Sequence, residues 1–190
     1  MGKSRKMAAA FGVALLGGLG LVAAQTMRSS GGMTLPSYVD GKELVQPEGY
    51  RKWVFVGASI GLSYSENNSN ANPGPGRFHH IYIQPEAYAE YERSGRFPEK
   101  TMLVMEVHDP EQKVSINRQG YFEGKRVALE VAVKDRETFE DGWAYFDFGN
   151  GGKKSARAFA SERCYSCHKQ HGASDNVFTQ FYPALRDLKK

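Results

Sequence analysis

Both cysteines of the chain lie in one five-residue segment, Cys164-Tyr165-Ser166-Cys167-His168, which has the form C-x-x-C-H. In an exported protein this pattern is typical of covalent c-type haem attachment. Positions i and i+3 share one face of a helix, so both thiols can reach the two vinyl groups on one edge of a porphyrin. The adjacent His168 would then supply an imidazole as the proximal iron ligand. The segment therefore predicts one covalently bound haem c per chain.

Two other chemistries use the same types of residue. His171 would place a fourth ligand beside the two cysteines and His168 on one helical stripe, which could bind zinc. Four ligands from two turns of one helix rarely close into a tetrahedron, however. A thioredoxin-type pair needs a low-pKa thiol at the start of a helix, whereas we expect these cysteines near the end of a helix over residues 154–169. Haem attachment is the preferred interpretation.

The N-terminal segment indicates export, which this kind of haem attachment requires. Three basic residues among the first six precede an uncharged, Ala-, Gly- and Leu-rich run over 7–24 that ends in small residues. This pattern predicts a secretory signal peptide over 1–24 and a periplasmic protein, with a retained membrane anchor as the alternative. The whole chain has a formal net charge of +4. Removing the signal peptide takes away three basic residues and leaves 22 Lys and Arg against 21 Asp and Glu. Such a balance excludes the electrostatic footprint of a nucleic-acid-binding protein.

The remaining chain indicates one domain of the α+β class. Residues 25–45 are Ser/Gly-rich and aperiodic, so we expect a linker or N-terminal arm there and a domain over 46–190. Short strands with the helices mostly outside them favour a β-rich antiparallel sheet with flanking helices and a C-terminal haem-binding helix. An Asn-, Pro- and Gly-rich loop is expected over 66–77. We expect strands over 50–59, 79–83, 101–108, 126–134 and 142–148, and helices over 85–94 and 154–169.

Aromatic residues make up 12% of the chain, which suits a protein that encloses a flat apolar group. A haem needs an apolar enclosure on its distal side, opposite the proximal histidine. The expected strands can supply this enclosure with Phe55, Phe78, Met105, Phe146 and Phe148.

Across residues 47–187 the chain resembles the cytochrome P-460 family. The resemblance implies a β-rich fold with the haem bound through the C-terminal C-x-x-C-H, in a periplasmic homodimer. One kind of member oxidises hydroxylamine with a haem cross-linked to a lysine, and the cytochrome c-prime-beta relatives lack the cross-link and bind gases such as nitric oxide. The segments that carry the resemblance are YRKWVFVG (50–57), IYIQPEAYAEY (81–91), ALEVAVKD (128–135), GWAYF (142–146), CYSCHK (164–169) and VFTQFYPALR (177–186).

The resemblance also assigns residues to the distal pocket. Met105 stands where the cross-linking lysine is expected, so that bond cannot form there. His79 matches a distal arginine and becomes the expected acid/base or hydrogen-bond donor, since strand alternation lets only one of His79 and His80 face the haem. Glu130 matches the pocket carboxylate, and either holds a proton or pairs with His79. Met105 itself either lines the pocket, which we favour, or binds the iron as a thioether ligand.

These residues lead to two functional hypotheses. The first is a periplasmic mono-haem c-type cytochrome that binds, or exchanges electrons with, small nitrogen oxides such as nitric oxide and hydroxylamine. It would have a periplasmic electron-transfer partner. The second is a haem oxidoreductase that oxidises hydroxylamine without the lysine cross-link. The remaining histidines, His108 and His171, are expected on the surface.

Overall fold

A five-stranded antiparallel sheet forms the centre of the protein in the computed structural model, which describes residues 32–62 and 74–188. The strands follow one another in chain order, so each pairs with its neighbour in sequence. This arrangement, with a few helices around it, confirms the expected α+β class. The strands are β3 (Val54–Ile60), β4 (Phe78–Ile83), β5 (Met102–Glu111), β6 (Phe122–Lys134) and β7 (Trp143–Asp147).

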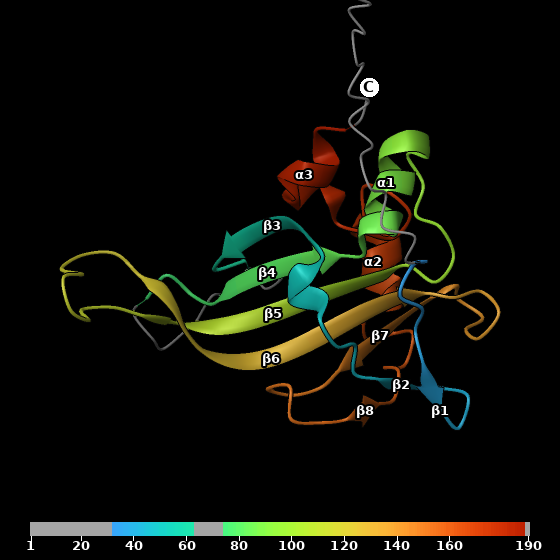
Figure 1. Cartoon of the computed structure of the whole chain (residues 1–190), viewed down its shortest axis with the longest axis horizontal. Coiled ribbons are helices and arrows are strands. Elements are labelled where there is room, and N and C mark those ends of the chain that lie inside the picture. The colour runs from blue at the N-terminus through green and yellow to red at the C-terminus, as the bar shows by residue number, and fades with distance from the viewer. Residues whose placement is uncertain (1–31, 63–73, 189–190) are drawn as a thin grey trace, which may run out of the picture. The chain divides into compact units, whose positions relative to one another are not determined.

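Different elements cover the two faces of this sheet (Figure 1). One face carries the helices α1 (Pro85–Ser94), α2 (Tyr165–His171) and α3 (Pro183–Arg186), and we call it the helical face. The other face packs on a three-stranded sheet of β1 (Tyr38–Val39), β2 (Glu43–Val45) and β8 (Ser155–Ala156), and we call it the small-sheet face. Two 3-10 turns, η1 (Tyr50–Lys52) and η2 (Thr179–Phe181), complete the fold.

Strand alternation divides the apolar side chains between the two faces, because successive residues of a strand point to opposite sides. In β5, Leu103 and Met105 belong to the core of the helical face, with Tyr91 of α1 and Leu185 of α3. The small-sheet face has its own core, which joins Met102, Val104, Leu129, Val131, Val133 and Phe146 to Leu44 and Ala156. Both faces of the central sheet therefore pack against a core. Whether a strand residue has an odd or an even position along its strand decides which face it lies on.

Helix α1 has the bounds that the sequence predicts. Pro85 occupies the first turn, where its missing N–H costs no hydrogen bond. Gly95 ends the helix at φ 70°, and its N–H donates to the Tyr91 carbonyl at 2.8 Å. A left-handed residue at this position favours glycine because it has no Cβ.

Three expected elements differ in the structure. The helix expected over 154–169 is wrong for its first eleven residues, because Ala156 pairs with Leu44 across β8 and β2 and Ala158 bridges to Phe146. Long-range pairing there overrides the helical propensity of alanine. Part of the expected linker, 38–45, forms strands β1 and β2, and Leu44 is fully buried.

The strand expected to start at Tyr50 begins four residues later, after η1. The proposed signal peptide over 1–24 lies outside the described residues, as does most of the loop expected over 66–77. Within the ranges 32–62 and 74–188, none of the helices has the length and hydrophobicity that crossing a bilayer requires.

Candidate functional site

The two cysteines lie at the beginning of α2, not near the end of a longer helix as the sequence suggested. Cys164 is the N-cap residue, and its carbonyl accepts a hydrogen bond from the His168 N–H at 3.1 Å. Both thiols are free and partly buried. Burial raises the pKa of the Cys164 thiol, and the nearby Glu130 carboxylate raises it further. A thioredoxin-type nucleophile needs the opposite shift, so the environment of Cys164 does not favour redox-thiol chemistry.

The imidazole of His168 is fixed through its Nδ1 atom. This atom lies 3.0 Å from the carbonyl oxygen of Asn176. A carbonyl oxygen can only accept, so Nδ1 carries the hydrogen and Nε2 keeps its lone pair. Burial lowers the pKa of His168, which keeps the ring neutral. The ring packs against Tyr145 and Phe178, with centroid separations of 4.3 Å to each. A neutral imidazole oriented through Nδ1 is the usual form of a metal-ligating histidine.

The loop that carries Asn176 is itself tightly held, and sequence reasoning missed the residues that hold it. Asp175 and Asn176 adopt left-handed backbone angles, with φ 47° and 62°. The buried Lys134 donates from Nζ to Asp175 Oδ2 at 2.6 Å, and Trp143 Nε1 donates to Asp175 Oδ1 at 3.4 Å. The only sequence signals were an Asp-Asn pair, which tolerates left-handed angles, and a lysine directly after the apolar run 131–133 at the end of β6.

Gly172 closes the same loop sterically. A Cβ atom at this position would lie 2.7 Å from the His168 carbonyl oxygen and 2.7 Å from the Asn176 carbonyl carbon. Both are backbone atoms, so neither can move aside by changing a rotamer. The contact between α2 and the Asn176 turn therefore depends on glycine at 172.

A cavity of about 960 Å³ opens on the helical face of the sheet. His79, Met105 and Glu130 all line it. Met105 pairs with Ile81 of β4 on one side and with Glu130 of β6 on the other, so neighbouring strands bring these side chains together. Cofactor and ligand sites usually measure about 300–1,000 Å³, so this cavity is at the upper end of that range. Apolar parts of its wall come from Leu62, Ile81, Val107, Phe181 and Tyr182.

Two of the titratable residues that line the cavity, Glu130 and His79, favour their neutral forms. Burial raises the pKa of Glu130, and the cross-strand Asp147 carboxylate raises it further, while Arg163 acts in the opposite direction. Burial lowers the pKa of His79, with smaller effects of Arg77 and His80. Ser59 Oγ lies 3.3 Å from His79 Nδ1. Strand β5 lies between β4 and β6, so His79 and Glu130 act on the cavity separately rather than as a direct pair.

The aromatic wall expected from four phenylalanines is not there. Phe146 and Phe148 are fully buried in the core of the small-sheet face. Phe78 is adjacent to His79 in β4 and therefore points to the opposite face. Phe55 packs on Tyr82 and His80, also on the small-sheet face, and is 49% exposed. None of the four phenylalanines therefore lines the cavity, which corrects the expectation. The sequence alone did not show which of the two alternating sets of side chains on each strand faces the cavity.

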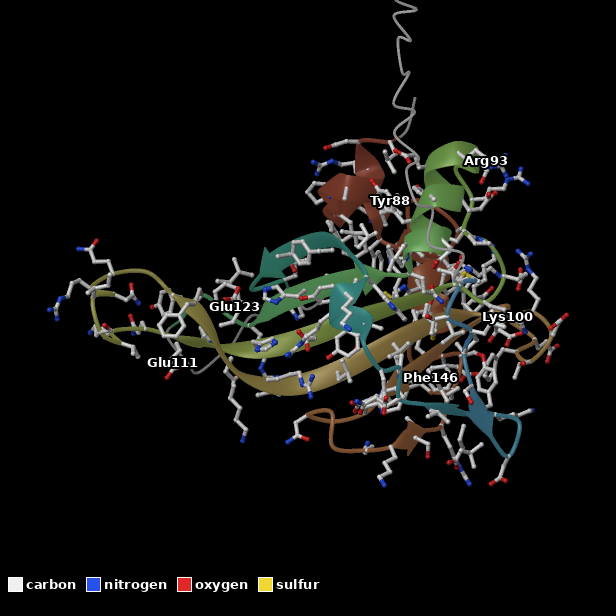
Figure 2. All side chains as sticks on the ribbon, in the orientation of Figure 1. Tyr88, Arg93, Lys100, Glu111, Glu123 and Phe146 are labelled. Atoms are coloured by element: carbon white, nitrogen blue, oxygen red, sulfur yellow. The ribbon has the colours of Figure 1, made fainter. Side chains whose placement is uncertain are left out.

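The lysines near the cavity in sequence are engaged elsewhere. Lys100 donates to Asp135 at 2.6 Å and also pairs with Glu137. Figure 2 shows Lys100 at the opposite end of the long strands from Glu123. Lys134 is bound to Asp175, as described above. The β5 side chain that lines the cavity at the position expected for the cross-linking lysine is the thioether of Met105.

The thiols and the cavity belong to one region of the helical face. Cys164 packs in the same cluster as Met105 and Tyr182. Its thiol also lies close enough to Glu130 for the two groups to influence each other's ionisation. Two partly buried thiols lie near an imidazole whose Nε2 makes no hydrogen bond within the described residues, and the nearby Glu130 lines the cavity. Together these groups form an arrangement that fits a haem. In contrast, the four candidate zinc ligands of α2 do not form a metal-ligand cluster, since the one such group among the described residues is on the other face.

Comparison with known proteins agrees with this donor set. Residues 47–179 match the cytochrome P460 family, and this match covers most of the chain. No curated protein sequence matches the chain. The chain belongs to the cytochrome P460 family, and is therefore a haem-binding cytochrome.

Proposed function

We propose that this protein is an exported mono-haem c-type cytochrome whose distal face binds, or exchanges electrons with, small nitrogen oxides. Cys164 and Cys167 would hold the porphyrin through thioether bonds, and Nε2 of His168 would be the proximal ligand. The bound haem would supply an iron coordination site and one-electron chemistry. His79, Met105 and Glu130 would then form the distal wall.

The observation that carries this proposal is the thioether at Met105 in the middle of the cavity wall. A thioether has no N–H to lose, so it cannot form the amine-to-porphyrin bond of the hydroxylamine-oxidising members. The nearby Lys100 and Lys134 are held by carboxylates away from the cavity. This chain therefore fits the kind of family member that binds gases without a cross-link.

The polar residues of the cavity would act on a bound ligand. A neutral His79 can donate one hydrogen bond to a nitrogen-oxide oxygen, and its ring can accept a proton at its other nitrogen. Burial raises the pKa of Glu130, so its carboxyl group holds a proton more readily than an exposed glutamate and can deliver it across the cavity. This second property also favours the alternative function, oxidation of hydroxylamine without the cross-link, because that reaction releases protons.

Optical spectroscopy of the purified protein tests the proposal. A Soret band that stays with the polypeptide through acid-acetone extraction, and is lost in C164A/C167A, is the expected result for covalent haem c. Tight nitric oxide binding to the ferrous protein without steady-state hydroxylamine oxidation would support the binding cytochrome. A colourless protein overturns the haem assignment. Sustained hydroxylamine turnover overturns the binding role in favour of the enzyme.

We also propose a periplasmic homodimer with a separate electron-transfer partner. The edge strand β3 exposes Phe55 and Ile60, and exposed apolar side chains on an edge strand favour association with another chain. Light scattering of the purified protein should give twice the chain mass, and F55K should reduce it to one. Recovery of the processed chain in the periplasmic fraction tests the location, and an unprocessed chain in the membrane fraction contradicts signal cleavage.

A further inference from the structure

The small-sheet face carries a second cluster of potential metal ligands, separate from the haem site. His80, Glu106 and His108 each offer a ligand atom, and these atoms all lie within 4.8 Å of one another. His80 pairs directly with Glu106 across β4 and β5. His108 follows Glu106 by two residues in β5, and alternation places both on the same side. We propose that His80, Glu106 and His108 bind a divalent transition-metal ion, best matched by Zn²⁺.

His108 contributes an unsatisfied ring nitrogen to this cluster. Its Nδ1 lies 3.1 Å from the Gly124 carbonyl oxygen, which can only accept, so Nδ1 carries the hydrogen. The Nε2 atom is buried and has no hydrogen-bond partner within the described part of the chain. It faces Glu106 Oε2 at 3.6 Å. In the neutral ring, two lone pairs therefore face each other in a site from which water is largely excluded. Such an arrangement is costly unless a proton or a metal cation lies between them.

Glu106 is held through only one of its two carboxylate oxygens in this cluster. Its other oxygen, Oε1, accepts hydrogen bonds from the Tyr50 hydroxyl at 2.5 Å, from Arg51 Nη2 at 2.7 Å and from Arg126 Nη1 at 3.0 Å. These donors saturate Oε1 and leave Oε2 as the oxygen that can bind an ion. Glu106 is only 2% exposed. Outer-shell donors that orient a ligating carboxylate in this manner are typical of metal sites.

Glu123 lies beside the three proposed ligands and extends the donor set. His80 Nε2 lies 3.0 Å from Glu123 Oε1 on β6, so a second carboxylate adjoins the cluster. Figure 2 shows Glu123 beside β4 at the end of the sheet away from Lys100. Two imidazoles and two carboxylates suit zinc in four-coordinate geometry. Zinc–ligand bonds of 2.0–2.2 Å make a tetrahedral edge of about 3.3 Å, close to the 3.6 Å between His108 and Glu106.

The same contacts also limit the expected affinity. His80 has to rotate toward Glu106 to complete the site, which its partly exposed side chain permits. Arg51 and Arg126 offset the negative charge of Glu106. We therefore expect reversible zinc binding, weaker than that of a closed structural site made of thiolates.

The test uses the haem-loaded protein, in which the haem occupies Cys164, Cys167 and His168. After chelator treatment, calorimetric titration with zinc chloride should show one saturable site per chain and a rise in melting temperature. H108A and H80A should each weaken zinc binding at least tenfold without changing the Soret band. H171A, which removes an exposed histidine on α2, is the matched control and should bind zinc as the parent protein does.

Two outcomes overturn the proposal. One is the absence of saturable zinc binding by the parent protein, and the other is equal affinity in the parent, H80A and H108A. If H108A does not fold, H80A provides the comparison, because the His80 side chain is only partly buried. Anomalous scattering at the zinc edge from zinc-soaked crystals of the parent protein provides an independent decision. Density between His108 Nε2 and Glu106 Oε2 supports the site, and density only elsewhere rejects it.

Discussion

The Asn176 carbonyl oxygen accepts a hydrogen bond from His168 Nδ1 at 3.0 Å, and this contact fixes the direction in which Nε2 points. The same oxygen lies 3.4 Å from the hydroxyl of Tyr145, which donates to it. The carbonyl is therefore shared by the proposed iron ligand and by a residue of the central sheet. The position of His168 relative to the cavity depends on a backbone atom of the 172–178 loop. Substitutions in this loop should therefore change the optical spectrum of the haem although they remove none of its proposed ligands.

Gly172→Ala should disturb this contact most directly. Its Cβ would lie 2.7 Å from backbone atoms of both His168 and Asn176, which forces the two segments apart. We expect unfolding free energy to fall by about 2 kcal/mol, as for other overpacked sites, and the reduced Soret band to shift. Chemical denaturation and optical spectra measure these effects. Gly32→Ala, where nothing lies within 4 Å, is the control and should have little effect. Equal behaviour of the two variants would contradict this account of Gly172.

Lys134→Met should loosen the loop from the other side. The Lys134 ammonium donates to the Phe97 carbonyl at 2.7 Å and to Asp175 at 2.6 Å, in a largely buried position. Removing one partner of such a pair leaves a carboxylate without its counter-charge, and the expected loss of stability is about 3 kcal/mol. The midpoint potential of the haem should change as well, because Asp175 adjoins Asn176. Lys52→Met changes an exposed lysine and should alter neither quantity.

Met105→Ala distinguishes a cavity wall from an iron ligand. If Met105 lines the cavity, the parent protein lacks the long-wavelength thioether–iron charge-transfer band and the variant keeps the parent's coordination state. The larger cavity should then admit bulkier ligands, at a cost in stability of about 2 kcal/mol. Met105→Leu keeps the volume and should behave like the parent. A charge-transfer band that is present in the parent and lost in both variants would assign Met105 as the axial ligand instead.

Glu130 should make stability depend on pH in a specific direction. Burial and Asp147 raise its pKa in the folded state above the ordinary value of 4.5. The folded protein then holds a proton that the unfolded chain releases, so the stability contributed by Glu130 is full below pH 4.5 and is lost as pH rises through the raised pKa.

Thermal melts of the parent and of Glu130→Gln measure this effect between pH 4 and pH 8. The parent should lose stability relative to the variant as the pH rises through this window. Glu92→Gln, at an exposed position, should follow the parent at every pH. A difference in melting temperature between the parent and Glu130→Gln that stays constant from pH 4 to pH 8 would contradict a contribution of the Glu130 proton to stability.

The sequence predicted those features that depend on local pattern. The spacing of Cys164, Cys167 and His168 predicted the candidate haem-attachment site, and the alternation of apolar residues located strands β5 and β6. What it could not predict depends on contacts between distant segments. The alanines at 156 and 158 join strands because Leu44 and Phe146 lie opposite them.

The same limit explains the misplaced phenylalanines and His108. Phe78 and His79 are neighbours on one strand, and composition does not reveal which of the two faces a cavity. His108 was expected on the surface, but the Gly124 carbonyl and Glu106 enclose it. Glu106 and His108 are two residues apart on a strand, and this spacing was the one sequence signal for their cluster.

Strand β5 presents Met105 to one face of the sheet and Glu106 to the other, so two sites share a single strand and lie one residue apart. A slip of one residue in its pairing would exchange the two side chains between the faces. Insertions and deletions of one residue within Met102–Val107 should therefore damage both sites together. The number of residues in this part of β5 is therefore a requirement that the two sites have in common, although they use different side chains.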